Sequence, residues 1–275
     1  MSVNVAIGVQ DFSTLIENHY FYVDKTAFIK EWWEAGDDVT LITRPRRFGK
    51  TLNMDMLKCF FSNQYTGRAD LFEGLSIWKE EKYRELQGQY PVIFVSFASI
   101  KANNYKDARD GIISAVFGAY QEYYSLFQEN GIAESEKLFF RELNTYVNTT
   151  APDKEITNES IFRALNSLSA CLFRYYGKKA IILLDEYDTP LQEAYVDDYW
   201  DELTLFIRGL FNASFKSNPY LEKAILTGIT RVSKESVFSD LNNLKVITTT
   251  SNEYADSFGF TEKEVKQLLK DYDLF

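Results

Sequence analysis

Gly49, Lys50 and Thr51 stand together directly before a helix-like sequence, and these residue types in this order can bind a phosphate group. A glycine lets the backbone turn so that successive N–H groups face phosphate oxygens, and the helix that follows adds its positive N-terminal end. The lysine can reach the β- and γ-phosphates of a nucleotide, and the threonine hydroxyl can coordinate Mg²⁺. The stretch matches the phosphate-loop pattern G-x-x-x-x-G-K-[ST] except at its first position, where Arg44 stands. The candidate nucleotide-binding residues of this loop are Pro45, Arg46, Arg47, Phe48, Gly49, Lys50, Thr51 and Leu52.

A second candidate group is a pair of acids that follows the apolar run Ala180–Leu184. An aspartate at the end of a buried strand, here Asp185, can hold Mg²⁺, and the adjacent Glu186 can polarise a water that attacks the γ-phosphate. This is a Walker B pattern. Each motif alone has a simple alternative, a chance Gly-Lys-Thr or a buried strand that ends in solvated acids, but their joint occurrence in this order favours a nucleotide site. The sequence therefore predicts metal ligands at Thr51 and Asp185 and catalytic roles for Lys50 and Glu186.

A third polar cluster follows the apolar run Ala224–Ile229 and includes Thr227, Thr230 and Arg231. Ligands of α/β sheets lie at the carboxyl ends of the strands, so Thr227 could sense the γ-phosphate and Arg231 could act as a sensor or as an arginine finger. For Thr227 the alternative is a local hydrogen bond beside a turn glycine. For Arg231 it is a solvated surface position. Both are kept as candidate catalytic residues.

These motifs need a sheet to position them, and the sequence contains four short apolar runs separated by long helix-like stretches. Continuous rather than alternating apolar runs indicate strands that are covered on both faces, as in a parallel sheet between helices. The remaining strand candidates are Val39–Thr43 and Val92–Phe97, and the crossover-helix candidates are Tyr105–Glu129 and Ser160–Tyr176. The predicted fold class is α/β, a P-loop NTPase fold with a mainly parallel sheet and a helical insertion at about residues 130–160.

Composition excludes several other classes of protein. The chain has 275 residues with a formal net charge of −10, which disfavours direct binding of nucleic acid by its surface. One histidine and two cysteines are too few for a Cys/His zinc cluster or a disulfide framework. No apolar run is long enough for a membrane helix, and the first residues do not resemble a signal peptide, so we expect a cytoplasmic protein with no membrane partner.

The sequence resembles the predicted AAA-ATPase-like family, which is related to the AAA+ and STAND ATPases, over nearly its whole length. The resemblance rests on the phosphate loop and on the following segments: Ile7-Gly8-Val9-Gln10-Asp11-Phe12, Tyr22-Val23-Asp24-Lys25-Thr26, Leu184-Asp185-Glu186-Tyr187-Asp188-Thr189-Pro190, Thr227-Gly228-Ile229-Thr230-Arg231, Phe238-Ser239-Asp240-Leu241-Asn242-Asn243-Leu244 and Phe258-Gly259-Phe260-Thr261. The family's phosphate loop usually begins Arg-Pro-Arg-Arg-Phe-Gly-Lys, so it accounts for Arg44. It also implies that the N-terminal segment lies near the adenine, with Val9, Phe12 and Tyr22 as candidate contacts.

By the same resemblance, residues 1–260 form the ATPase domain and residues 261–275 begin a helical lid that is truncated here. Thr261 and Glu264 form a capping-box pattern at the start of this last predicted helix. Its apolar face could pack on the core, bind a protein partner or mediate self-association. Family members often continue into a PD-(D/E)xK nuclease-like domain, so the chain is either a natural short form or lacks the lid and the nuclease.

The function expected from these observations is Mg²⁺-dependent ATP hydrolysis coupled to a conformational change, with ATP and Mg²⁺ as cofactors. A nucleotide-dependent switch or scaffold with little turnover is the first alternative. The second is the ATPase module of a DNA-processing or defence nuclease whose nuclease domain is absent.

Overall fold

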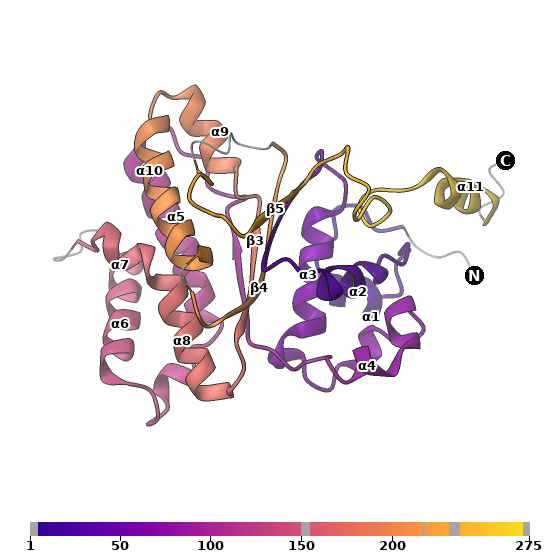
Figure 1. Cartoon of the computed structure of the whole chain (residues 1–275), viewed down its shortest axis with the longest axis horizontal. Coiled ribbons are helices and arrows are strands. Elements are labelled where there is room, and N and C mark those ends of the chain that lie inside the picture. The colour runs from indigo at the N-terminus through magenta and orange to yellow at the C-terminus, as the bar shows by residue number, and fades with distance from the viewer. Residues whose placement is uncertain (1–4, 150–154, 217, 231–236, 272–275) are drawn as a thin grey trace. The chain divides into compact units, whose positions relative to one another are not determined.

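The structure is a computed structural model, and it describes residues 5–149, 155–216, 218–230 and 237–271. The chain divides into two compact units. Unit 1 comprises Met1–Gly36, Arg44–Tyr90 and Ile247–Phe275, and unit 2 comprises Asp37–Thr43 and Pro91–Val246. The phosphate loop belongs to unit 1, whereas the strand directly before it in the chain belongs to unit 2. Figure 1 shows the elements of both units along the chain.

Unit 2 contains a five-stranded sheet in the order β2-β3-β4-β1-β5. The pairs β1–β4, β3–β4 and β2–β3 are parallel. Thr43 pairs with Gly228, and Ser96 pairs with Asp185, so the carboxyl ends of these four strands meet at one edge of the sheet. The strands are β1 (Val39–Thr43), β2 (Val92–Ser96), β3 (Ala180–Asp185), β4 (Leu221–Gly228) and β5 (Leu244–Ile247).

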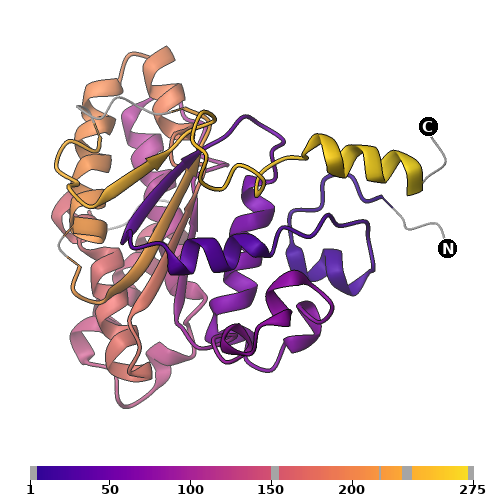
Figure 2. The same ribbon diagram turned by 45° about the vertical axis from the view of Figure 1, so that its right-hand side comes forward.

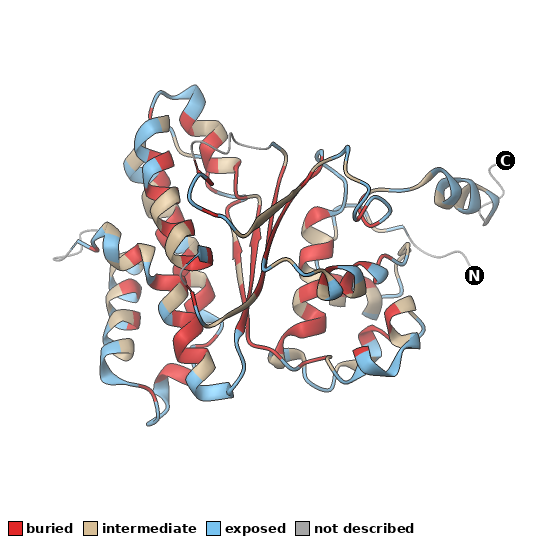
Figure 3. Cartoon of the chain, viewed as in Figure 1, coloured by how far each residue is buried: buried red, intermediate tan, exposed pale blue. Residues whose placement is uncertain are grey.

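The burial of the strands explains why their sequences are continuously apolar. Every residue of β1 and of β3 is buried, which requires cover on both faces of the sheet. Figure 3 shows this buried colour along the central strands. The α/β fold with a parallel sheet is therefore confirmed, and the four predicted strands are all present. The fifth strand, β5, was not predicted.

The helices of unit 2 include α5, α8 and α10, which gather on one face of the sheet in both views (Figures 1 and 2). The predicted helix at Ser160–Tyr176 is two helices, because the helical pattern is interrupted at Arg163, between α7 and α8. The helices are α5 (Tyr105–Gln121), α6 (Glu134–Asn148), α7 (Asn158–Phe162), α8 (Ala164–Tyr176), α9 (Thr189–Val196) and α10 (Trp200–Phe211), with short helical turns at Leu126–Gln128 and Asn212–Lys216. The predicted insertion contains α6.

Unit 1 is helical and has an aromatic core. Phe12 stacks on Phe72, and Phe60 meets both Phe61 and Phe72 edge to face. Trp32 is fully buried beside Phe61. Such ring pairs stabilise a small core beyond the area that they bury. The helices are α1 (Phe12–Glu17), α2 (Ala27–Glu34), α3 (Lys50–Phe61), α4 (Glu81–Arg84) and α11 (Glu262–Asp271), with short 3-10 turns at Asn63–Tyr65, Ala69–Leu71 and Ser76–Lys79.

Among the residues that the structure describes, no helix is both long enough and apolar enough to cross a membrane.

Candidate functional site

The phosphate loop of unit 1 has the backbone conformation that an anion-binding loop requires. Arg47 and Gly49 both adopt left-handed conformations, with φ of 67° and 73°. The helix α3 begins directly afterwards at Lys50, and no side chain caps its N-terminus. Alternation of left-handed with other residues turns N–H groups toward one side of a loop, and a helix N-terminus carries a partial positive charge. The loop and α3 therefore fit a phosphate group.

Lys50 is buried within its own loop. Its side chain is only 5% exposed. The ammonium group donates hydrogen bonds to the carbonyl oxygens of Arg44 and Pro45, at 3.1 and 3.0 Å. Lys50 thus bridges the two ends of its own loop, and a ligand phosphate has to compete with these carbonyls.

Arg44, which stands where the phosphate-loop pattern has its first glycine, is also buried. Its guanidinium lies over the ring of Phe258, 5.5 Å from the ring centre. Burial lowers the pKa of Arg44 from its ordinary value. The arginine therefore packs inside unit 1, and the phosphate-binding part of the loop is left to the residues from Pro45 onward.

An apolar cavity of about 220 Å³ lies beside the phosphate loop within unit 1. Two of the three residues expected near the adenine, Val9 and Tyr22, line this cavity, whereas Phe12 is fully buried and does not. The Tyr22 hydroxyl accepts a hydrogen bond from the Lys25 N–H, and burial raises the pKa of this tyrosine. The remaining lining residues are Val5, Ala6, Leu15, Phe21, Val23, Lys25, Arg47, Phe48, Gly49, Leu52, Asn53, Ser257, Gly259 and Phe260.

The second group of predicted residues lies in unit 2, at the carboxyl ends of β3 and β4. Asp185 and Thr227 are both fully buried, and the Thr227 hydroxyl donates a hydrogen bond to the Asp185 carboxylate. The same hydroxyl accepts from the Glu186 N–H at 3.4 Å. The structure thus brings Asp185, Glu186 and Thr227 together, and the hydrogen bonds of the Thr227 hydroxyl described here join it to the segment after β3.

Glu186 has an unusual backbone conformation, with φ of 50°. Left-handed backbone is costly for a residue with a side chain, and it persists where the surroundings fix it. The Thr189 hydroxyl donates to the Glu186 carboxylate at 3.2 Å. The half-buried glutamate is therefore held by α9, the helix that follows it.

Asp188 is a third acid of this segment that the sequence reasoning did not assign to the site. One of its carboxylate oxygens accepts from the Ile229 N–H at 3.0 Å and from the N–H and the hydroxyl of Thr230, both at 2.8 Å. It also accepts from the Gln192 side chain at 2.9 Å. The other oxygen packs against Gly228, where a Cβ would come within 2.6 Å of it. Asp188 therefore ties the end of β3 to the turn after β4, and the spacing Asp-Glu-x-Asp was the signal for it.

We expect Asp188→Ala to lower the free energy of unfolding by about 1–3 kcal/mol, because the donors of the β4 turn lose a buried charged acceptor. Asp188→Asn keeps one acceptor oxygen and should lose less. Glu193→Gln, on the helix α9 that begins directly after Asp188, is the matched control and should stay within about 0.5 kcal/mol of the wild type. Urea denaturation followed by circular dichroism measures all three. Equal stability of Asp188→Ala and the control would contradict the role given to Asp188.

Arg231 lies outside the residues that the structure describes, so its role stays a prediction.

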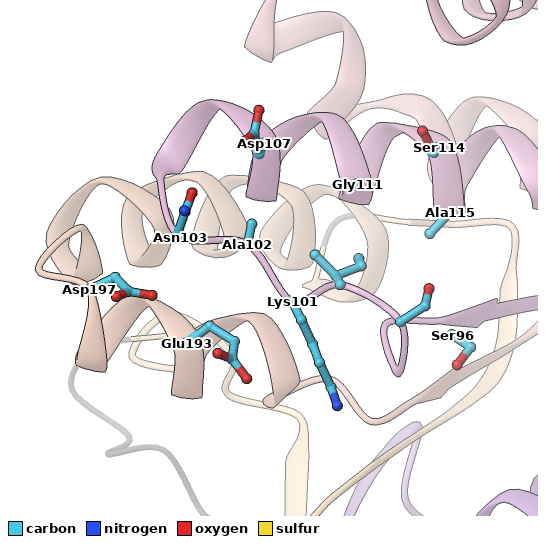
Figure 4. A pocket seen from close by; sticks show the side chains of 12 residues that line it. Ser96, Lys101, Ala102, Asn103, Asp107, Gly111, Ser114, Ala115, Glu193 and Asp197 are labelled. Carbon is cyan, nitrogen blue, oxygen red and sulfur yellow. The ribbon is translucent and has the colours of Figure 1, made fainter.

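A larger cavity of about 650 Å³ lies in unit 2, between the start of α5 and α9 (Figure 4). Its charged lining comprises Asp107, Glu193 and Asp197 against Lys101. Three carboxylates and one ammonium do not suit a polyphosphate, because like charges repel it. The smaller cavity of unit 1 is the better candidate for a nucleotide.

The donor set predicted for a metal consists of the Thr51 hydroxyl in unit 1 and the Asp185 carboxylate in unit 2. Both are oxygen ligands of the kind that Mg²⁺ prefers, and Mg²⁺ commonly keeps several waters and binds substrate phosphates. Among the described residues, no group of three or more His, Cys, Asp and Glu side chains could hold a metal. Each of the two oxygen donors, taken by itself, is therefore of a kind that suits Mg²⁺.

The fold and the loop define an α/β protein of the P-loop NTPase type. A family model described as "Predicted AAA-ATPase" matches residues 6–238. The chain therefore belongs to the predicted AAA-ATPase family, as the sequence motifs indicated.

One curated relative is an uncharacterized protein in the vnfD 5′ region of Azotobacter chroococcum mcd 1. It is 29% identical over 261 residues, which cover 94% of this chain and 43% of the relative. The chain thus spans less than half of that protein's length. No solved structure gives a significant match.

Proposed function

We propose that the chain binds ATP with Mg²⁺ and hydrolyses it. The observation that carries the proposal is the combination found within unit 1, a phosphate loop with left-handed Gly49 that leads into the uncapped α3 beside an apolar cavity. An apolar pocket with a few polar groups is what a flat aromatic base requires, and the loop beside it supplies the anion site. Membership of the predicted AAA-ATPase family supports nucleotide binding.

In this proposal each predicted residue acts on one part of the nucleotide. Tyr22 and Val9 contact the base, the backbone of residues 45–49 holds the phosphates, and Lys50 neutralises their charge. Thr51 and Asp185 would hold Mg²⁺, which would supply positive charge to the phosphate oxygens.

Glu186 acts on the attacking water in the same proposal. Its carboxylate would accept a hydrogen bond from that water and orient the oxygen toward the γ-phosphate. Thr227 fixes both acids, because it bonds the Asp185 carboxylate and the Glu186 N–H. Within unit 2, the parallel sheet supports the assignment of the acids, because Asp185 and Thr227 lie at the carboxyl ends of neighbouring strands, where ligands of α/β sheets bind.

A switch with little turnover is the second candidate, and one contact favours it. The Glu186 carboxylate is engaged by the Thr189 hydroxyl, so the general base has a competing partner. In that case nucleotide binding would set a conformation without fast hydrolysis.

Titration calorimetry with ATP, with and without Mg²⁺, tests the proposal. We expect binding in the micromolar range, typical of nucleotide sites, and weaker binding after Mg²⁺ is removed with EDTA. A phosphate-release assay on the same sample separates the enzyme from the switch. Absence of binding of ATP and ADP at millimolar concentrations would refute both.

A further inference from the structure

Lys25, in the segment Tyr22-Val23-Asp24-Lys25-Thr26, is buried and makes an ion pair within unit 1. Only 9% of it is exposed. Its ammonium group donates to both carboxylate oxygens of Glu264, at 2.7 and 2.8 Å, and to the carbonyl oxygen of Asp256, at 2.6 Å. An ammonium group has three donors, so these oxygens account for all of its hydrogen bonds. Loss of the Glu264 carboxylate is costly, because it leaves the buried Lys25 ammonium group without its charged partner, whereas Glu264 itself is partly exposed.

Glu264 in turn fixes the start of the last helix, α11. Its carboxylate accepts from the Thr261 N–H at 2.7 Å, and the Thr261 hydroxyl accepts from the Glu264 N–H at 3.2 Å. This reciprocal pair is a capping box. Burial alone would raise the pKa of Glu264, but the hydrogen bonds from Lys25 and Thr261 hold it below the ordinary value. The carboxylate is therefore charged at neutral pH, and the ion pair with Lys25 is complete.

The segment 256–264, which we call the strap, also contacts the phosphate loop and α3. The Gly259 N–H donates to the Phe48 carbonyl oxygen at 3.0 Å, and the Asn53 side chain donates to the Ser257 carbonyl oxygen at 2.7 Å. Gly259 has φ of 75°, and a Cβ there would come within 2.9 Å of the Phe48 ring. The strap therefore approaches the phosphate loop closely at a position that requires glycine.

The strap and Lys25 are also part of the apolar cavity. Lys25, Ser257, Gly259 and Phe260 all line it. Because the ammonium group of Lys25 is fully used by Glu264 and Asp256, it has no donor left to identify a base. Asp24 accepts from the Ser76 N–H at 2.7 Å, which fixes the backbone beside Lys25. Through these contacts, Lys25 can hold the wall of the cavity in position.

We propose that Lys25 and Glu264 are positioning residues that latch the strap over the apolar cavity, so that binding of the nucleoside part of a nucleotide is coupled to the position of α11. This inference rests on the proposed function, because it takes the cavity to be the base site. It gives a role to Lys25 and to the segment Phe258–Thr261, which the proposed nucleotide chemistry does not use. Free inorganic pyrophosphate needs the loop alone, whereas ADP needs the latched cavity as well.

The test compares ADP with pyrophosphate in variants of the full chain. We expect Lys25→Met and Glu264→Gln each to weaken ADP binding about tenfold by calorimetry, and to change pyrophosphate binding less than threefold. The double variant should lose no more than Lys25→Met alone, because both changes remove the same contact. Lys266→Met is the control, since it breaks the exposed Lys266–Glu262 pair on the same helix and leaves the latch intact.

Hydrogen exchange gives a second readout at α11. In the wild type, ADP should slow exchange in residues 262–271, and in the latch variants it should not. Glu264→Gln keeps the shape and the capping acceptor, so it serves if Lys25→Met fails to fold. ADP affinity or α11 protection that is equal in the wild type and Glu264→Gln would overturn the latch, with the proposed function intact. A wild type that binds neither ADP nor pyrophosphate would overturn the proposed function and the latch with it.

Discussion

Lys50→Ala is expected to raise the Kd for ATP by at least about 100-fold, because a charged contact to two phosphates is lost. The lysine stands at the start of α3 with its ammonium group bound to the carbonyls of Arg44 and Pro45. It is therefore placed over the loop before any ligand arrives, and little side-chain freedom is lost when a phosphate replaces the carbonyls. Calorimetry with ATP measures the effect.

The same contacts require a control for folding, because Lys50 is buried and its loss removes two hydrogen bonds. Their loss should cost about 1–2 kcal/mol of stability. The thermal midpoint of Lys50→Ala separates this cost from the loss of binding, and Lys58→Ala, in the last turn of the same helix, gives the matched variant away from the loop. A folded Lys50→Ala that binds ATP as tightly as Lys58→Ala would refute the phosphate site.

The strand, the turn at Gly49 and the helix that follows could be predicted from sequence because they are neighbours in the chain. The strand, the glycine and the start of the helix follow one another within about a dozen residues. Their order determines the local backbone with little influence from the rest of the chain. The partner of the Lys50 ammonium group could not be predicted, since a lysine stem reaches carbonyls several residues away and only the folded loop brings them near.

In the sheet too, strands with a local sequence signal could be predicted, and a strand that depends on distant neighbours could not. The buried strands β1 and β3 carry continuous apolar runs, and these predict them. The strand β5 has four residues, of which only Ile247 is buried, and it becomes a strand by lying beside β1 at the edge of the sheet. Its residues favour a strand, but Lys245 interrupts them, so β5 lacks the continuous apolar run by which the other four strands were predicted. The break between α7 and α8 at Arg163 likewise lies within a single helical pattern.

The strap could not be predicted because its contacts join distant parts of the chain. Lys25 and Glu264 are separated by 239 positions, and Asn53 and Ser257 by 204. Nothing in the spacing of either segment indicates the other. The capping box of Thr261 and Glu264 is the local part of this structure, and it was predicted correctly.

Glu186→Gln is expected to bind ATP with a Kd within about threefold of the wild type and to lose at least about 100-fold in kcat. The amide has nearly the shape of the carboxylate and can still accept from Thr189, whose hydroxyl now bonds the Glu186 side chain. It cannot accept a proton or polarise the attacking water as the carboxylate does. A phosphate-release assay and calorimetry on the same preparation measure the two quantities.

Glu186 has a left-handed backbone, and the substitution is expected to leave this backbone unchanged. The glutamine side chain has the same length, and the N–H of residue 186 can still donate to the Thr227 hydroxyl. The geometry of Asp185 and Thr227 is therefore expected to stay intact, and a loss of turnover reports on the carboxylate itself. Glu193→Gln makes the same chemical change on α9 and should hydrolyse ATP at the wild-type rate. Unchanged turnover in Glu186→Gln would exclude this residue as the base. A wild type that binds ATP and releases phosphate no faster than a protein-free blank would support the switch, in which the Thr189 contact occupies the carboxylate.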